Sequence, residues 1–295
     1  MNQNKHNLLT LHQLILKGKE TLGAHAKPDA HIDAELLALH VLGYTKLERI
    51  LNANIQVESQ HIKRYNEYIT KRCEGIPLQY IIGDQEFMGL PFYVDPHVLI
   101  PRQDTETLVE VLIERSKMTP FKHIIEIGVG SGCISISLAK FLEDVEIVGI
   151  DISPKALEIA KRNAEANGVD QHIQWIHGDL LTNYQGPEKY DLIVSNPPYI
   201  STKEYNALEL DVKEHEPMLA LEAGTDGLDF YRRITIQSKE HLAPGGMLAY
   251  EIGYNQGEAV ADLLKKNRFA QIEIIKDLAH KDRIVLGRLE EQDKR

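Results

Sequence analysis

Cysteine is scarce in this chain of 295 residues. Cys73 and Cys133 form neither a spaced metal-binding motif nor a disulfide framework. Long apolar runs are also missing, since none approaches the roughly 18 residues of a membrane-spanning helix. The apolar patch near the N-terminus is interrupted by His12 and Gln13, and Lys17 and Lys19 follow it. This pattern predicts an amphipathic helix of a cytoplasmic protein rather than a secretory leader. We expect no metal site and no contact with membranes.

An excess of basic residues is absent as well. The formal net charge is −11. Residues 1–85 hold ten Lys and Arg against nine Asp and Glu, which leaves the remainder at −12. A protein that binds duplex DNA needs a basic surface along the phosphate backbone, and no obvious basic patch is present. We therefore expect no direct nucleic-acid partner.

The composition, 43% apolar and 26% charged, is that of a globular protein, and the length suggests about two domains. Residues 1–85 predict a helical domain, because apolar residues recur there at helical spacing. One stretch ends at Gly43, and another runs from Ser59, a plausible cap, to about Arg72. Glycines and prolines punctuate residues 75–106, which predicts a small β-hairpin at the joint, with residues 86–106 as the β-hairpin linker. Residues 107–295 form the remaining domain.

From residue 107 onward, apolar runs alternate with helical stretches. Such alternation predicts an α/β fold with a seven-stranded, mostly parallel, doubly wound sheet, which is Rossmann-like. The last two runs leave no room for a helix between them, so we expect an antiparallel pair at one edge. The candidate strands are His123–Ile127, Ile147–Asp151, Ile173–His177, Tyr190–Ser195, Met247–Ile252, Gln271–Lys276 and Arg283–Leu289.

The end of the fourth strand has unusual chemistry. Asn196, Pro197, Pro198 and Tyr199 follow the apolar run. Neither proline has a backbone N–H, so hydrogen bonding in the sheet must stop there and the rim stays extended. The Asn196 oxygen and a proline carbonyl can accept the two N–H bonds of a planar –NH2 group, and the tyrosine ring can pack on its flat face. These four residues are candidate catalytic and substrate-binding residues.

A glycine-rich loop follows the first strand of the sheet and opens a helix. Glycines allow a close backbone approach to a ligand, and the helix N-terminus offers free N–H groups. The G-x-G-x-G spacing is near the dinucleotide fingerprint G-x-G-x-x-G, which stays a rival. A carboxylate at the strand end would repel a pyrophosphate but suits a cationic methionine moiety. The candidate cofactor residues here are Glu126, Gly128, Val129, Gly130, Ser131 and Gly132.

Two further carboxylates end strands of the same sheet. Asp151 ends the second strand and can accept both hydroxyls of a ribose, although it can also cap the helix that starts at Pro154. Asp179 follows the third strand, where it can accept an adenine amino group with Leu180 against the ring; alone it would be a loop aspartate. All these groups, with Asn196, lie at carboxyl ends of strands, where open α/β sheets bind ligands.

Several segments together resemble one family. NPPY resembles the (D/N)PPY signature of S-adenosylmethionine-dependent methyltransferases that act on amide-like or exocyclic amino nitrogens, and the whole domain resembles their class I fold. GIPLQYIIG, VLIPRQDTE, HEPMLALEAGTDGLDFYRRI and YEIGYNQG narrow the resemblance to the release factor glutamine methyltransferase family (PrmC, also called HemK). The resemblance implies methylation of the glutamine of the Gly-Gly-Gln motif of class I peptide chain release factors. It also implies S-adenosylmethionine as donor, S-adenosylhomocysteine as product, and docking of the release factor on the helical domain.

Some questions stay open at the level of sequence. Arg102 can brace the cofactor or substrate pocket, or pair with Asp104 or Glu106. His280 stands where the family usually has glycine. The closest rival function is an N6-adenine or N4-cytosine DNA methyltransferase, which needs base flipping and a basic recognition segment. A rival of another class is a non-catalytic nucleotide-binding adaptor. We expect a monomer.

Overall fold

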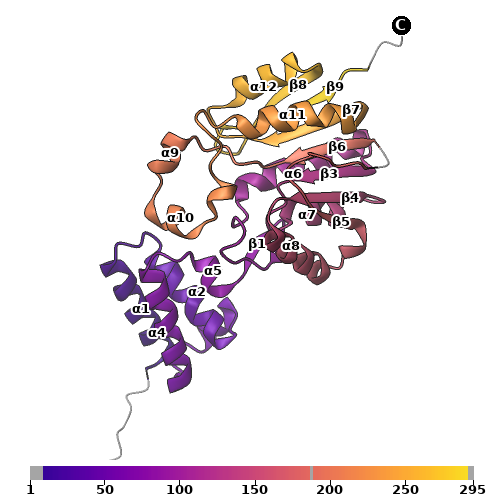
Figure 1. Cartoon of the computed structure of the whole chain (residues 1–295). Coiled ribbons are helices and arrows are strands. Elements are labelled where there is room, and N and C mark those ends of the chain that lie inside the picture. Colours follow the sequence, from indigo (N-terminus) through magenta and orange to yellow (C-terminus); the bar gives the residue numbers. More distant parts are fainter. Residues whose placement is uncertain (1–8, 187–188, 292–295) are drawn as a thin grey trace, which may run out of the picture. The chain divides into compact units, whose positions relative to one another are not determined.

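The computed structural model describes residues 9–186 and 189–291 (Figure 1). The chain forms two compact units. The first comprises the chain up to Gly83 together with Leu210–His215, and the second comprises Asp84–Glu209 and the chain from Glu216 onward. The sequence did not predict that residues 210–215 join the first unit. Across the described ranges, no helix is both long and apolar enough to cross a membrane.

The first unit is built from helices around the buried side chains of Leu11, Leu14, Leu22, Leu37 and Tyr65. Thr10 and Gln13 cap the first helix reciprocally. The second helix ends, as predicted, at Gly43, which has φ 65°. The prediction of Ser59 as a cap is wrong, because Glu58 holds the cap position. The helices are α1 (Leu11–Ala24), α2 (Ala30–Leu42), α3 (Lys46–Leu51), α4 (Ser59–Cys73), α5 (Leu78–Ile82) and α10 (Leu210–His215).

Helix α10 joins the first unit through an ion-pair cluster. The Oδ2 atom of Asp211 lies 2.7 Å from Nζ of Lys27 and 3.5 Å from Nη1 of Arg72. The same Arg72 pairs through Nε with Asp33 at 2.7 Å. Three of these four side chains are largely shielded from water, so the pairs are less screened than exposed ones. A segment encoded far downstream thus completes the helical unit.

The second unit opens with an antiparallel hairpin, β1 (Gln85–Phe87) and β2 (Leu90–Phe92). Its turn uses Met88 and Gly89, both with positive φ, as tight hairpin turns require. The buried rings of Phe87 and Phe92 meet edge to face with their centroids 6.0 Å apart. Both rings belong to the core of the second unit. The hairpin therefore packs into the core of this unit.

All seven predicted strands are present in one sheet with the order β5-β4-β3-β6-β7-β9-β8. Neighbouring strands pair in parallel except around β9, which lies between β7 and β8 and is antiparallel to both. The predicted antiparallel pair at one edge is confirmed. The strands are β3 (His123–Ile127), β4 (Glu146–Asp151), β5 (Ile173–His177), β6 (Tyr190–Ser195), β7 (Leu242–Glu251), β8 (Phe269–Lys276) and β9 (Asp282–Leu289).

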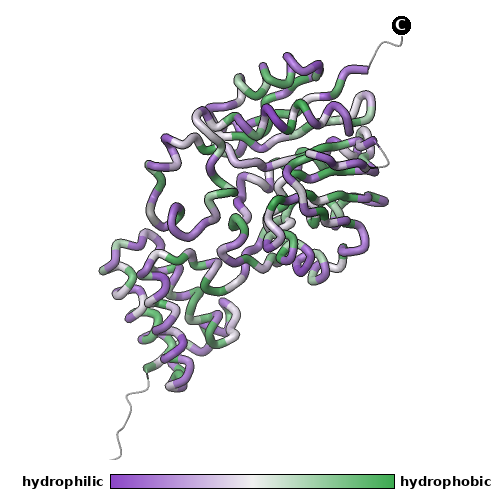
Figure 2. The backbone as a smooth tube through the Cα atoms, in the orientation of Figure 1, coloured by the Kyte–Doolittle hydropathy of each residue, from purple (hydrophilic) through white to green (hydrophobic). Residues whose placement is uncertain are grey.

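Alternate residues of the strands enter two different cores, one on each face of the sheet. Ile124 belongs to the core that contains Leu108 of α6, whereas its neighbour Ile125 belongs to the core that contains Ile234 of α11. Figure 2 shows hydrophobic residues along the central strands. Both faces are covered, as a parallel sheet requires. The helices of this unit are α6 (Gln103–Met118), α7 (Cys133–Phe141), α8 (Pro154–Asn167), α9 (Thr202–Asn206), α11 (Asp229–His241) and α12 (Gly257–Lys266).

The strand order reverses at β3. The chain passes from β3 to β4 and β5 on one side, and then returns to β6 on the other side. Ile127 at the end of β3 pairs with Ile150 of β4 and with Ser195 of β6. The carboxyl ends of these three strands are therefore adjacent. Such a switch point is where open α/β sheets form their ligand sites.

Candidate active site

A cavity of about 310 Å³ lies at this switch point. Most of the predicted site residues line it. Gly132 and Tyr199 do not: Gly132 is the cap residue of α7, and Tyr199 packs against the core beneath. The predicted residues that line the cavity are Arg102, Glu126, Gly128, Val129, Gly130, Ser131, Asp151, Asp179, Leu180, Asn196, Pro197 and Pro198.

The glycine loop has a backbone that other residues rarely adopt. Gly128, Gly130 and Gly132 have φ of 75°, 55° and 84°. A Cβ atom on Gly132 would lie 2.9 Å from Ile136 and 3.2 Å from Ala160, so α7 and α8 approach closely there. The glycines at 128 and 130 face open space. The loop therefore presents bare backbone to the cavity.

Asp151 holds this loop in place. Its Oδ2 accepts a hydrogen bond from the N–H of Gly130 at 2.9 Å, and its Oδ1 accepts one from Ser153 at 2.8 Å. Burial raises the pKa of Asp151, and these two bonds oppose the rise. Ser153 itself caps α8 by accepting from Ala156. Since each carboxylate oxygen can accept more than one hydrogen bond, Asp151 keeps acceptor capacity toward the cavity.

Glu126 is a buried carboxyl at the wall of the cavity. Its side chain is 1% exposed, and Oε2 accepts hydrogen bonds from the N–H and the hydroxyl of Ser135. Burial raises the pKa of Glu126 to about 8, and the charge of Asp151 adds to the rise. A cation in the cavity would favour the ionised form of both carboxyls.

Asp179 and Leu180 lie in the loop that follows β5. Asp179 pairs with Arg233 of α11, Nη2 to Oδ2, at 2.6 Å. Both side chains are close to half exposed, so the pair contributes little to stability. Leu180 has φ 55° and packs against the core with its side chain half-buried. The sequence did not single out Arg233, which also lines the cavity.

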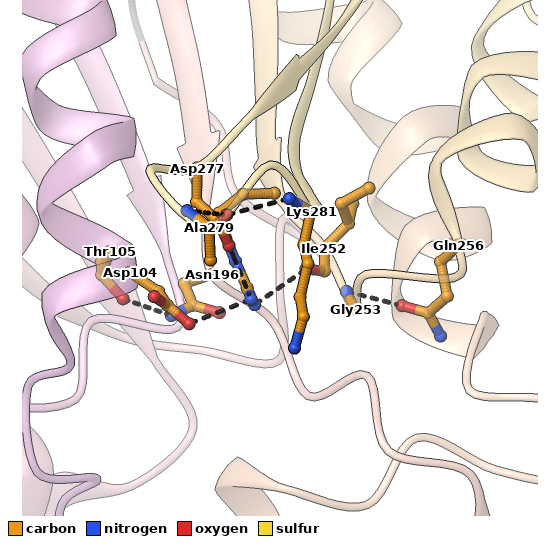
Figure 3. A network of polar contacts seen from close by, with 10 residues as sticks. Asp104, Thr105, Asn196, Ile252, Gly253, Gln256, Asp277, Ala279 and Lys281 are labelled. Carbon is orange, nitrogen blue, oxygen red and sulfur yellow. Dashed lines mark hydrogen bonds and ion pairs between the residues drawn. The ribbon is translucent and has the colours of Figure 1, made fainter.

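The NPPY segment continues directly from β6. The hydroxyl of Ser195 donates to the carbonyl of Ile127 at 2.6 Å and ties the strand end to β3. Nδ2 of Asn196 donates to Oγ1 of Thr105 at 3.2 Å (Figure 3). The carbonyl of Tyr199 accepts from Nε2 of Gln256 at 2.9 Å, and burial raises the pKa of the Tyr199 phenol to about 12.

Arg102 does not pair with either of the acids considered from the sequence. Its Nη2 contacts both carboxylate oxygens of Glu216, at 2.5 and 2.7 Å. Asp104 instead pairs with Arg283 at 2.9 Å, and Glu106 accepts the N–H of Met88 at 2.6 Å. Arg102 lines the cavity and is anchored by a carboxylate that is itself buried.

His280 lies in the turn between β8 and β9 with φ 59°. Its N–H donates to the carbonyl of Asp277 at 2.9 Å, which closes the turn. The backbone here is left-handed, a conformation that favours glycine and that this chain keeps with a histidine.

Known proteins resemble this chain both in sequence and in fold. The PrmC N-terminal domain model matches residues 13–83, and the Methyltransferase small domain model matches residues 102–215. Among solved structures, the hMettl16 catalytic domain superposes with a TM-score of 0.57 at 17% identity, covering 77% of this chain and 83% of that one. A methyltransferase from Pyrococcus furiosus gives 0.51 at 16% identity, with coverages of 70% and 91%. The fold and the cavity define a Rossmann-like methyltransferase.

Proteins of known function narrow this class. A release factor glutamine methyltransferase from Clostridium acetobutylicum is 43% identical over 256 residues, which cover 86% of this chain and 90% of the relative. One from Geobacter sulfurreducens is 38% identical over 97% of this chain and 99% of the relative. The chain belongs to the release factor glutamine methyltransferase family. It is therefore a methyltransferase.

Proposed function

We propose that this enzyme methylates the side-chain nitrogen of the glutamine in the Gly-Gly-Gln motif of class I peptide chain release factors. The single observation that favours it most is the orientation of Asn196. Its Nδ2 is committed to Thr105, so its Oδ1 is left to accept an N–H from a planar amide. A proline carbonyl is the natural second acceptor. Two acceptors suit a primary amide, which has two N–H groups.

We further propose S-adenosylmethionine as methyl donor, bound by the glycine loop. Asp151 would accept the ribose hydroxyls, and the free oxygen of Asp179 would accept from the adenine amino group beside Leu180. The buried carboxyl of Glu126 suits the positive charge of the methionine part. When bound, the cofactor supplies an electrophilic methyl group on a sulfonium.

The protein residues then act by positioning. An amide nitrogen is a poor nucleophile because its lone pair is delocalised. Hydrogen bonds from both N–H groups to the rim push electron density toward that nitrogen and fix its direction. Asn196 and the prolines therefore contribute orientation and electrostatics rather than covalent catalysis.

The substrate and its setting complete the proposal. The helical domain, proposed from the sequence as residues 1–85, would dock the release factor, with the hairpin region 86–106 leading to the methyltransferase domain 107–295. A release factor substrate would place the reaction in the cytoplasm. The enzyme would act as a monomer and without direct contact to nucleic acid.

Mass spectrometry tests the proposal. A release factor is incubated with this protein and S-adenosylmethionine, and the peptide with the Gly-Gly-Gln motif is analysed. We expect one methyl group on the glutamine and none when that glutamine is replaced by alanine. Transfer to adenine or cytosine of a DNA substrate, with the release factor unmodified, would contradict the proposal and favour the DNA methyltransferase alternative. A chain that binds the donor and methylates neither would be an adaptor.

A further inference from the structure

Glu251 is a buried carboxyl that the mechanism above does not use. It is the last residue of β7, and its neighbour Tyr250 pairs with Ser195 at the end of β6. The side chain is 1% exposed, and its Oε2 atom accepts no hydrogen bond from the residues that the structure describes. Leaving a buried carboxyl oxygen unpaired is unfavourable, so such a group needs a reason other than stability.

Thr105 connects this carboxyl with the NPPY segment. Thr105 lies in the first turn of α6, is 2% exposed, and accepts from Nδ2 of Asn196. The Thr105 hydroxyl and the Asn196 amide also lie within hydrogen-bonding reach of Glu251, where both lower its pKa. Figure 3 shows Thr105 and Asn196 side by side, one from α6 and the other from the end of β6.

Two contacts decide which way the amide of Asn196 points, namely its own hydrogen bond to Glu251 and the single proton of the Thr105 hydroxyl. An ionised carboxylate only accepts, so the hydroxyl donates to Glu251 and can only accept from Asn196. Asn196 must then present Nδ2 to Thr105 and Oδ1 away from it. A protonated Glu251 can donate to Thr105 instead, which frees the hydroxyl proton and permits the flipped amide. The flipped amide would point its own N–H groups at the N–H groups of the substrate, and two donors form no hydrogen bond.

The charges around Glu251 come from several elements. Arg283 of β9 lowers the pKa of Glu251, and Asp104 of α6 raises it. Arg283 is held between Asp104 at 2.9 Å and Asp277 at 3.2 Å. The tyrosine hydroxyls at 199 and 231 and the thiol of Cys133 are neutral neighbours, since burial raises their pKa values. Against these influences, burial is the largest and raises the pKa of Glu251 to about 7.

We propose that Glu251 is a positioning residue that acts both directly and through Thr105 to keep the carboxamide oxygen of Asn196 facing the substrate nitrogen. This inference rests on the proposed glutamine methylation for its kinetic consequence. The orientation of the Asn196 amide itself does not depend on the substrate. Ionised Glu251 is the active form, so turnover falls as the pH drops below the pKa of this carboxyl.

The kinetic test compares Glu251→Gln and Thr105→Val with wild type. Each variant should lower kcat about tenfold, the loss expected from one oriented hydrogen bond, with little change in the KM for S-adenosylmethionine. Thr105→Ser keeps the hydroxyl and should lose far less than Thr105→Val. Ser137→Ala is the matched control, because it removes a buried hydroxyl that has no partner among the described residues and lies outside the cavity. Wild-type kcat should show an acidic limb near pH 7 that Glu251→Gln lacks.

A spectroscopic test separates this inference from the proposed function. The side-chain 15N–H2 signals of Asn196 should shift with pH near 7 in the wild type and not in Glu251→Gln, whether or not a release factor is methylated. Wild-type failure to methylate would count against the proposed function alone. Identical pH dependence of the Asn196 signals in both proteins would overturn the inference. If Glu251→Gln does not fold, Thr105→Val replaces it in the same two assays. Asn196 signals and a kcat that both match those of the wild type would then overturn the inference.

Discussion

The carboxylate of Asp151 accepts the N–H of Gly130 at 2.9 Å, and this bond ties the end of β4 to the glycine loop after β3. The two residues are 21 positions apart in the chain. A loop of glycines has little intrinsic preference for one conformation. Asp151 thus has two roles, since it fixes the loop and keeps acceptor capacity for a ligand.

Asp151→Ala should weaken S-adenosylmethionine binding by about tenfold or more, because hydrogen bonds to charged acceptors contribute about 1.5–3 kcal/mol each. The loop N–H groups also lose their acceptor, so the free energy of unfolding should fall by about 1–3 kcal/mol. Calorimetry and thermal unfolding measure the two effects. Ser153→Ala is the control, because it removes the cap of α8 and should lower stability with much less effect on affinity. Equal affinity in Asp151→Ala and wild type would leave Asp151 as a structural residue only.

We expect Glu126 to make cofactor binding depend on pH. Below pH 8 its carboxyl is mostly protonated in the free protein, because burial raises its pKa to about 8. A cationic ligand favours the ionised form and lowers this pKa, so binding at pH 7 should release a proton and affinity should rise toward pH 8. Calorimetry in two buffers with different heats of ionisation measures the proton. Glu126→Gln should release fewer protons when S-adenosylmethionine binds, and NAD should not compete with S-adenosylmethionine for the site. Tight NAD binding without a response to S-adenosylmethionine would refute the assignment of the cofactor.

The helical domain should matter more for intact release factor than for a short peptide. Removing residues 1–83 leaves every proposed cofactor residue in place, so donor affinity should change little. Methylation of the whole release factor should fall much more than methylation of a Gly-Gly-Gln peptide. The deletion also removes the partners of α10, because Asp211 of this helix pairs with Lys27. Asp211→Ala in the full-length protein is therefore the control for the loss of that contact. Equal losses on both substrates would mean that the domain supports folding and not docking.

His280→Gly should stabilise the protein slightly. A left-handed backbone at a residue with a side chain costs about 1–2 kcal/mol, and the greater freedom of glycine in the unfolded chain offsets part of the gain. We expect a net increase of up to about 1 kcal/mol in the free energy of unfolding, measured by urea denaturation. Gly43→Ala is the reverse control, since Gly43 also has a positive φ, and it should destabilise. A loss of stability in His280→Gly would show that the histidine ring makes favourable contacts.

The sequence predicted the central strands well because buried parallel strands have nearly continuous apolar runs, as β3, β4 and β6 do. Asp151, Asn196 and the glycine loop could be predicted because they follow those runs directly. Pairs between distant segments could not be predicted. Asn196 and Thr105 are 91 residues apart, and Arg102 and Glu216 are 114 apart. No local pattern specifies such pairings.

Neither the role of Glu251 nor the placement of α10 was predicted from the sequence, and the reasons differ. Glu251 interrupts an apolar strand, and a carboxylate in such a run is a signal of function that the sequence contained. Helix α10 offered no such signal, because its six residues are polar for the most part and its partners, Lys27 and Arg72, lie far upstream. That Tyr199 packs against the core and does not line the cavity also depends on tertiary packing.

The central claim is that the carboxamide of Asn196 orients the substrate nitrogen. Asn196→Asp keeps an acceptor but loses the donor to Thr105 and adds charge beside Glu251, so it should retain partial activity. Asn196→Ala removes the acceptor, and by analogy with a lost oxyanion-hole donor its turnover should fall about 10²–10³-fold. Stability should stay within about 1 kcal/mol across the three proteins, since a pocket rim contributes little to packing.

The most direct measurement is single-turnover methylation of a release factor by wild type, Asn196→Asp and Asn196→Ala with saturating S-adenosylmethionine. We expect rates in that order, with matched donor affinity and matched melting temperatures. Near-normal methylation by Asn196→Ala would contradict this expectation, because Asn196 would then be only the end of a strand.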